Sequence, residues 1–241
     1  MVNVERFSEA LVRLQKALST HKKVLITAPG AADGDSIGSQ LALQRMIWQQ
    51  FPNCEVTVLN DEPLPPRYLF LPDVETVETP ESMVEKKKEM KFEVGFVVDG
   101  GVDRAGRVKD IFDKCAVKVF IDHHKISADY PYDIPIVEST ASSTTELIFR
   151  LSQTPTFNTK IESTFAQMIY LGLIFDTGFF RHSNTTPELL ELAAVLLRTG
   201  FDFTRVGERG MLERTFPSLQ LMSDILSKAE MTHGGKVIYS S

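Results

Sequence analysis

The sequence lacks long apolar runs, clustered cysteines and an excess of basic residues, and each absence argues against a class of protein. A membrane helix needs about 20 mostly apolar residues, and no stretch of this chain approaches that length. Residues 1–20 mix Glu, Arg and Lys among apolar positions, unlike a signal peptide. Cys54 and Cys115 have neither CxxC spacing nor histidine neighbours, so no chemistry is assigned to them. We therefore predict a cytoplasmic protein without a membrane partner.

Net charge argues against a long nucleic-acid duplex as the partner. The chain has 26 Lys and Arg against 32 Asp and Glu, a formal charge of -6, whereas duplex binding depends on a broad basic surface. The short lysine run at residues 86–88 is flanked by glutamates, which is typical of a solvated helix face. Small phosphates remain compatible with this composition, because a bound metal supplies concentrated positive charge of its own.

Apolar spacing predicts an α/β fold with a parallel β-sheet flanked by helices, followed by a mainly helical segment. The expected strands are at residues 24–26, 56–59, 96–98 and 117–121. The expected helices are at residues 4–18, 41–47, 104–114, 144–151, 161–174, 187–197 and 218–229. Strands that alternate with helices favour a parallel sheet. Residues 236–239 resemble the beginning of one more strand.

Four segments with acidic or histidine side chains each follow an apolar run, where an open α/β sheet presents its ligand-binding loops. The first holds Asp33 and Asp35, two hard oxygen ligands separated by a glycine that permits a tight turn. The following helix start could also hold a phosphate. Taken alone, however, Asp-Gly-Asp is more typical of a plain surface turn.

The second and fourth segments are equally ambiguous in isolation. Asp99 ends a strand and has Asp103 and Arg104 nearby, and a guanidinium suits phosphate oxygens. Either aspartate could instead cap the following helix. Asp176 closes a strongly apolar helix, where a buried carboxylate is costly unless it is paired or bound to a metal. Capping of a helix end is the alternative.

The third segment, Asp122-His123-His124, is the most specific. Three side chains that commonly bind metals or transfer protons follow one strand, in a chain with only five histidines. A purely structural role is less favoured here than in the other segments.

Together the four segments resemble, in order and spacing, the motifs of the DHH phosphoesterase family, from about residue 24 onward. The matching positions are Asp33, Asp35, Gly38 and Ser39, then Asp99, then Asp122, His123 and His124, and finally Asp176. Residues 139–146 and 176–185 are similar to the nanoRNase/pAp-phosphatase branch. That branch degrades very short oligonucleotides from an end and dephosphorylates adenosine bisphosphate.

The resemblance implies two divalent cations, Mn²⁺ first and Mg²⁺ as the alternative. Asp99 would bridge them, Asp33 would bind one, and the other would be bound by Asp35, His123 and Asp176. Such a pair would activate a water and stabilise the leaving oxygen. Oxygen-rich ligation with one imidazole suits these hard ions.

The resemblance also implies roles around the metals. Asp122 would orient a histidine, while His124 and Arg104 would contact the scissile phosphate. Ser39 and Asn184 are expected to bind substrate.

Two departures from the family pattern matter. A histidine normally stands four residues before Asp33, and this chain has Pro29 there, which cannot bind a metal. The nearest histidine, His21, precedes the first strand, so we predict an impaired first metal site. We also expect residues 1–232 to form the catalytic domain, and residues 233–241 to be a linker or the start of a substrate-binding domain that the sequence does not contain.

The sequence therefore predicts a metal-dependent phosphoesterase that acts on short single-stranded oligonucleotides or small nucleotide phosphates such as pAp. One alternative is a manganese-dependent inorganic pyrophosphatase. Another is a catalytically impaired nucleotide-binding module, because of Pro29. The cleavage polarity and the oligomeric state stay open, a homodimer included.

Overall fold

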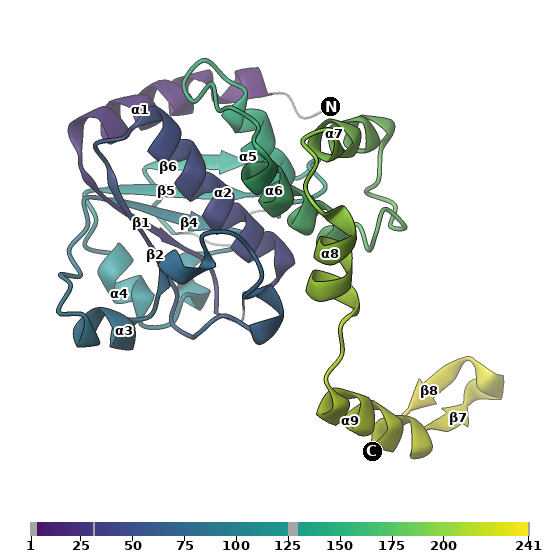
Figure 1. Ribbon diagram of the computed structural model, residues 1–241. Helices are drawn as coiled ribbons and strands as arrows, with labels where there is room; N and C mark the ends of the chain where they lie inside the picture. The colour runs from purple at the N-terminus through teal and green to yellow at the C-terminus, as the bar shows by residue number, and fades with distance from the viewer. Residues whose placement is uncertain (1–3, 31, 125–129, 241) are drawn as a thin grey trace.

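A computed structural model describes residues 4–30, 32–124 and 130–240, which build a six-stranded parallel sheet in the order β3-β2-β1-β4-β5-β6 (Figure 1). The strands are β1 (Lys23–Thr27), β2 (Glu55–Leu59), β3 (Val77–Glu78), β4 (Val94–Val98), β5 (Val117–Asp122) and β6 (Ile134–Val137). Every residue of the central strand β4 is buried, as expected for a parallel sheet with helices on both faces. The predicted fold class is confirmed.

Helices cover both faces of this sheet. One face is covered by α1 (Ser8–Thr20), α2 (Gly34–Gln50), α5 (Thr144–Ser152) and α6 (Ser163–Asp176), and the other by α3 (Pro80–Glu85) and α4 (Val108–Phe112) (Figure 1). Because side chains alternate along a strand, Phe96 and Val98 join the larger core under α2, while Val97 joins the smaller core under α4. Two apolar layers thus sandwich the sheet.

The predicted helix at residues 104–114 is interrupted. The structure has a 3-10 turn at Val102–Arg104 and then the short helix α4, with Gly106 between them at a φ of +55°. A left-handed residue breaks the α-helical hydrogen-bond ladder, so one continuous helix cannot form across it.

Helices α2 and α6 approach each other closely because glycines lie in their contact. A Cβ atom on Gly38 would lie 2.5 Å from the carbonyl oxygen of Met168 in α6, and one on Gly172 would lie 2.3 Å from Oδ1 of Asp35. Only glycine leaves room for this approach. The packing brings the carboxyl end of α6, with Asp176, beside the amino end of α2.

Glu78 ends the edge strand β3 with an almost buried carboxylate. Its oxygens accept hydrogen bonds from Lys86 at 2.8 Å, from Lys88 at 2.6 Å and from Ser82 at 2.6 Å. Burial alone raises the pKa of Glu78, but these hydrogen bonds outweigh it and lower the pKa to about 2. The charged group thereby anchors the chain after α3 to the edge of the sheet.

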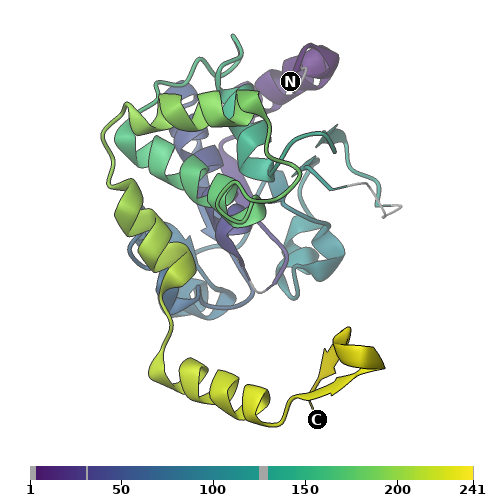
Figure 2. The same ribbon diagram turned by 90° about the vertical axis from the view of Figure 1, so that its right-hand side faces the viewer.

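The chain continues through α7 (Pro187–Leu197) and α8 (Phe203–Gly207), and then leaves the body of the molecule (Figure 2). Helix α9 (Phe216–Ser227) leads to an antiparallel pair, β7 (Glu230–Thr232) and β8 (Val237–Tyr239). This confirms the predicted helix at residues 218–229 and the strand near residue 236. The assignment of residues 233–241 to a linker or a further domain stays a prediction, and residue 241 lies outside the described residues. Within the described ranges, no helix is both long and apolar enough to cross a membrane.

Candidate metal centre and active site

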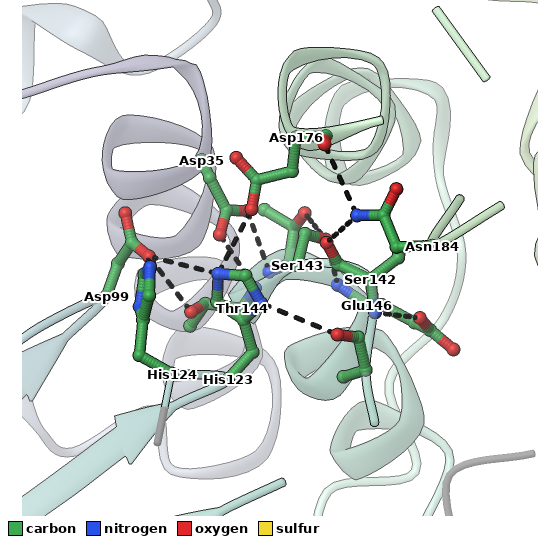
Figure 3. Close-up of polar contacts among 12 residues, drawn as sticks. Asp35, Asp99, His123, His124, Ser142, Ser143, Thr144, Glu146, Asp176 and Asn184 are labelled. Atoms are coloured by element: carbon green, nitrogen blue, oxygen red, sulfur yellow. Dashed lines mark hydrogen bonds and ion pairs between the residues drawn. The ribbon is translucent and has the colours of Figure 1, made fainter. Parts of the chain in front are cut away.

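The candidate site lies at the carboxyl edge of the sheet, where the loops after β1, β4 and β5 meet the end of α6 (Figure 3). Neighbouring parallel strands end at the same edge, so residues distant in sequence converge there. The predicted residues that gather at this edge are Asp33, Asp35, Asp99, Asp122, His123, His124 and Asp176.

Asp99 occupies a left-handed backbone conformation, with a φ of 58°, directly after β4. This conformation is uncommon for a residue with a side chain and costs on the order of 1 kcal/mol. Its carboxylate accepts hydrogen bonds from the hydroxyls of Ser36 at 2.9 Å and Thr144 at 3.1 Å. Burial, followed by the nearby carboxylate of Asp33, raises the pKa of Asp99 to about 6. The surrounding hydrogen bonds thus hold a strained residue and its costly carboxylate inside the site.

Asp35 is bound by the first turn of α5. Its two oxygens accept hydrogen bonds from the backbone N–H groups of Thr144 at 2.7 Å and Thr145 at 3.0 Å, an arrangement that the helix dipole favours for an anion. Burial, then the charges of Asp99 and Asp176, raise the pKa of Asp35 well above its usual value. Three carboxylates are therefore crowded together, and a bound cation would relieve their repulsion.

His123 supplies the nitrogen of this group. Its Nδ1 donates to the backbone oxygen of Ala141 at 3.4 Å, which leaves Nε2 3.1 Å from Oδ2 of Asp176 and 3.9 Å from Oδ1 of Asp99. Nε2 is buried and has no hydrogen-bond partner among the described residues. Although burial lowers the pKa of His123, Asp176 and Asp99 outweigh it and raise the pKa. The site favours positive charge at this point.

These residues fit a divalent metal ion. One ligand atom each from Asp35, His123 and Asp176 lies within 4.8 Å of the others. Two carboxylates and one imidazole suit Mn²⁺ or Mg²⁺ better than a thiophilic ion. The Ala141 carbonyl accepts a hydrogen bond from the other ring nitrogen of His123, an arrangement that commonly orients a histidine ligand toward its metal. Nε2 of His123 lies 3.1 Å from Asp176 without a well-aligned hydrogen bond, which leaves it available to a metal ion.

Asp122 and His124 form a pair at the rim of this group. Oδ1 of Asp122 accepts a hydrogen bond from the backbone N–H of His124 at 3.1 Å and lies 2.8 Å from Nδ1 of its ring. The Asp122 side chain is buried, whereas that of His124 is 61% exposed. The structure thus pairs Asp122 with His124 and leaves the other ring nitrogen of His124 without a hydrogen-bond partner among the described residues.

A model of the DHH family N-terminal domain matches residues 23–173. The chain belongs to the DHH family. The matched region runs from β1 into α6 and contains every candidate site residue named above except Asp176 and Asn184, which lie beyond its end.

Relatives of this DHH protein have been named in several bacteria. The chain is 27% identical over 192 residues to the bifunctional oligoribonuclease and PAP phosphatase NrnA of Mycoplasma pneumoniae, covering 79% of this chain and 57% of that protein. It is 29% identical over 219 residues to the protein of the same name from Thermus thermophilus, covering 86% and 59%. The chain therefore spans less than two thirds of the length of these relatives.

Solved structures support the same fold. An exopolyphosphatase-related protein from Bacteroides fragilis aligns with a TM-score of 0.82 at 26% identity, covering 93% of this chain and 66% of that one. A putative family II inorganic pyrophosphatase from Methanococcus jannaschii aligns with a TM-score of 0.54 at 20% identity, covering 78% and 59%. The second likeness supports the fold of the DHH domain alone.

Three further residues predicted to bind substrate or phosphate lie outside the ligand group. Ser39 is fully buried within α2. Arg104 is exposed, and its NH1 atom lies 3.8 Å from the position that a Cβ on Gly100 would occupy, so the guanidinium stands beside the turn that follows Asp99. Asn184 donates from Nδ2 to the backbone oxygens of Ser142 at 3.1 Å and Asp176 at 3.3 Å. It links the chain before α5 to the end of α6.

Four further residues support the site and were not assigned roles from the sequence. Ser36 and Thr144 bind Asp99, Thr145 binds Asp35, and Ala141 binds His123. A partial signal existed in the Ser/Thr-rich run at residues 139–145 with a glutamate at residue 146, because this pattern is typical of a helix start. Ser143 does cap α5, accepting from the N–H of residue 146 at 3.0 Å.

Proposed function

We propose that this protein is a metal-dependent phosphoesterase that hydrolyses short single-stranded oligonucleotides, small nucleotide phosphates such as pAp, or both. The observation that carries the proposal is the buried Nε2 of His123, which has no hydrogen-bond partner among the described residues and faces the carboxylates of Asp35 and Asp176. The names of the bacterial relatives support the substrate class. A cytoplasmic location is part of the same proposal, and the two free cysteines are compatible with it.

Mn²⁺ or Mg²⁺ would be held by Asp35, His123 and Asp176, with Asp99 beside them. When bound, the ion would supply Lewis acidity toward a phosphate and would lower the pKa of a water molecule. The remaining chemistry belongs to side chains at the rim. Arg104 can form paired hydrogen bonds with phosphate oxygens.

His124 is the candidate for proton transfer. Asp122 lies 2.8 Å from its Nδ1, which leaves Nε2 of this exposed side chain available to a substrate. A histidine fixed in this way can donate a hydrogen bond to the phosphate or a proton to the leaving oxygen. The pair thereby resembles the orienting carboxylate and histidine of other hydrolytic sites.

The test is hydrolysis by the purified full chain with Mn²⁺, using a 5′-phosphorylated trinucleotide, adenosine bisphosphate and pyrophosphate as separate substrates. We expect cleavage of at least one nucleotide substrate, and a fall of at least about 100-fold in His123→Ala. His21→Ala is the matched control, because His21 precedes β1 at the opposite edge of the sheet.

Three results would contradict the proposal. Faster hydrolysis of pyrophosphate than of either nucleotide would favour the pyrophosphatase alternative. Metal binding without turnover of any of these substrates would favour a nucleotide-binding module. Activity that persists in His123→Ala would show that the site lies elsewhere.

A further inference from the structure

The carboxylates of Asp33 and Asp99 are separated by a hydroxyl group of the protein itself. Oγ of Ser36 lies 2.9 Å from Oδ1 of Asp33 and 2.9 Å from Oδ2 of Asp99. Ser36 is nearly buried, at 5% exposure. A cation that joined these two carboxylate oxygens would have to displace this hydroxyl from between them.

One carboxylate oxygen of Asp33 is also engaged by the start of α2. Its Oδ1 accepts from the backbone N–H groups of Asp35 at 3.0 Å and Ser36 at 2.9 Å, and its own N–H donates back to Oγ of Ser36 at 3.3 Å. This reciprocal cap contributes about 1 kcal/mol to a helix. Neither group of potential metal ligands among the described residues includes Asp33.

Among the described residues of the loop after β1, no side-chain nitrogen faces this gap. Pro29 is buried there, and its Cγ lies 2.8 Å from the position of a Cβ on Gly100, so an apolar ring packs against the turn after Asp99. Hard cations need several oxygen or nitrogen donors from the protein unless a substrate or water supplies them. The described residues around Asp33 offer too few such donors.

A second group of potential ligands, formed by Asp99, Asp122, His123 and His124, cannot use His123 at the same time as the first. His123 belongs to both groups and has one free ring nitrogen, because Nδ1 already donates to the backbone. Asp122 and His124 are paired with each other at 2.8 Å. The two groups therefore compete for His123, and a cation in the second group would also have to separate Asp122 from His124.

We infer that, without substrate, the site binds one divalent cation per chain between Asp35, His123 and Asp176, and that Ser36 takes the place of a second cation between Asp33 and Asp99. The inference rests on the proposed metal dependence and specifies it further. Asp33 then acts as a helix cap. The hydroxyl of Ser36, which is hydrogen-bonded to Asp33, positions the carboxylate of Asp99.

The test is a titration of the metal-free full chain with Mn²⁺, followed by calorimetry and by electron paramagnetic resonance. We expect one Mn²⁺ per chain and the spectrum of an isolated ion at saturation. The double substitution Pro29→His with Ser36→Ala supplies an imidazole and removes the hydroxyl, so it is expected to bind a second Mn²⁺ that couples magnetically to the first. Pro135→His, on the exposed part of edge strand β6, is the matched control and should bind one ion.

Two ions per chain in the unsubstituted protein would overturn the inference and leave the proposed function intact. If one ion binds but Asp35→Asn does not weaken it, the ion lies elsewhere and both proposals fail. Failure of the double variant to fold would not remove the test, because the ion count of the unsubstituted chain decides it alone. A folded double variant that still binds one ion would show that Ser36 and Pro29 are not what excludes the second.

Discussion

Substitution of Asn184 by aspartate should loosen the metal centre without touching a ligand. The Asn184 amide donates to the backbone oxygens of Ser142 and Asp176, at 3.1 and 3.3 Å. Ser142 precedes the turn of α5 that binds Asp35, and Asp176 carries a ligand itself. Aspartate keeps the shape of asparagine but places a carboxylate oxygen against both acceptors.

The expected magnitude follows from those two hydrogen bonds. Each contributes about 1 kcal/mol net, so their loss destabilises the protein by about 2 kcal/mol, and unfavourable contact between oxygens adds to this. If the two bonds act mainly to hold the ligands in place, the Kd for Mn²⁺ rises by roughly 10-fold to 30-fold. Both effects should appear in the absence of substrate.

Stability is measured by urea unfolding of the metal-free protein, followed through the fluorescence of the single tryptophan, Trp48, and Mn²⁺ affinity by calorimetry. Asn158→Asp is the control, since Asn158 is exposed with a φ of 38°, a conformation that aspartate also tolerates. Unchanged unfolding and Mn²⁺ affinity, together with a raised KM, would refute the reasoning. That result would support the sequence-based prediction that Asn184 binds substrate.

Two further predictions concern stability. Gly38→Ala should destabilise the protein by about 2–4 kcal/mol, because its Cβ would lie 2.5 Å from a backbone oxygen of α6. Gly30→Ala is the control: its Cβ would lie 3.5 Å from the nearest backbone oxygen, so stability should change by less than about 1 kcal/mol. Thermal unfolding compares them, and equal effects would contradict the packing argument. Glu78, whose pKa is lowered to about 2, should contribute stability that is present above pH 4.5 and is lost as the pH falls toward 2. The pKa shift limits this contribution to about 3 kcal/mol, and solvent screening of the half-exposed lysine partners reduces it to about 1–2 kcal/mol. In urea unfolding at several pH values, Glu78→Gln should abolish this part of the pH dependence of the unfolding free energy. An unchanged pH dependence in the variant would contradict the prediction.

The central strands were predictable because burial on both faces leaves an unbroken apolar run. Residues 94–98 are buried throughout in the structure, and such runs need no partner to be recognised. The edge strands gave no such signal. β3 has two residues, and β6 contains Pro135 and alternates between buried and exposed positions. Proline is tolerated at an edge because it need not donate to a neighbour.

Ligand-type residues at the ends of strands were also predictable, whereas the groups that hold them were not. Asp35 depends on two backbone N–H groups of α5, and His123 on the backbone oxygen of Ala141. Every residue other than proline offers an N–H and every residue a carbonyl, so sequence carries no mark of which ones are used. Only the packing of α5 against α2 selects them.

The pair Asp33 and Asp35 shows where reasoning from residue type ends. Both are aspartates in one Asp-Gly-Asp turn, and the family resemblance assigns both to metals. In the structure Asp33 is the cap immediately before α2, so its carboxylate turns back onto the first N–H groups of that helix. Asp35 is the second helical residue, and its side chain points across to the start of α5, beside His123 and Asp176. A shift of two positions at a helix start therefore gives the two carboxylates different hydrogen-bond partners, and the distinction depends on where the helix begins.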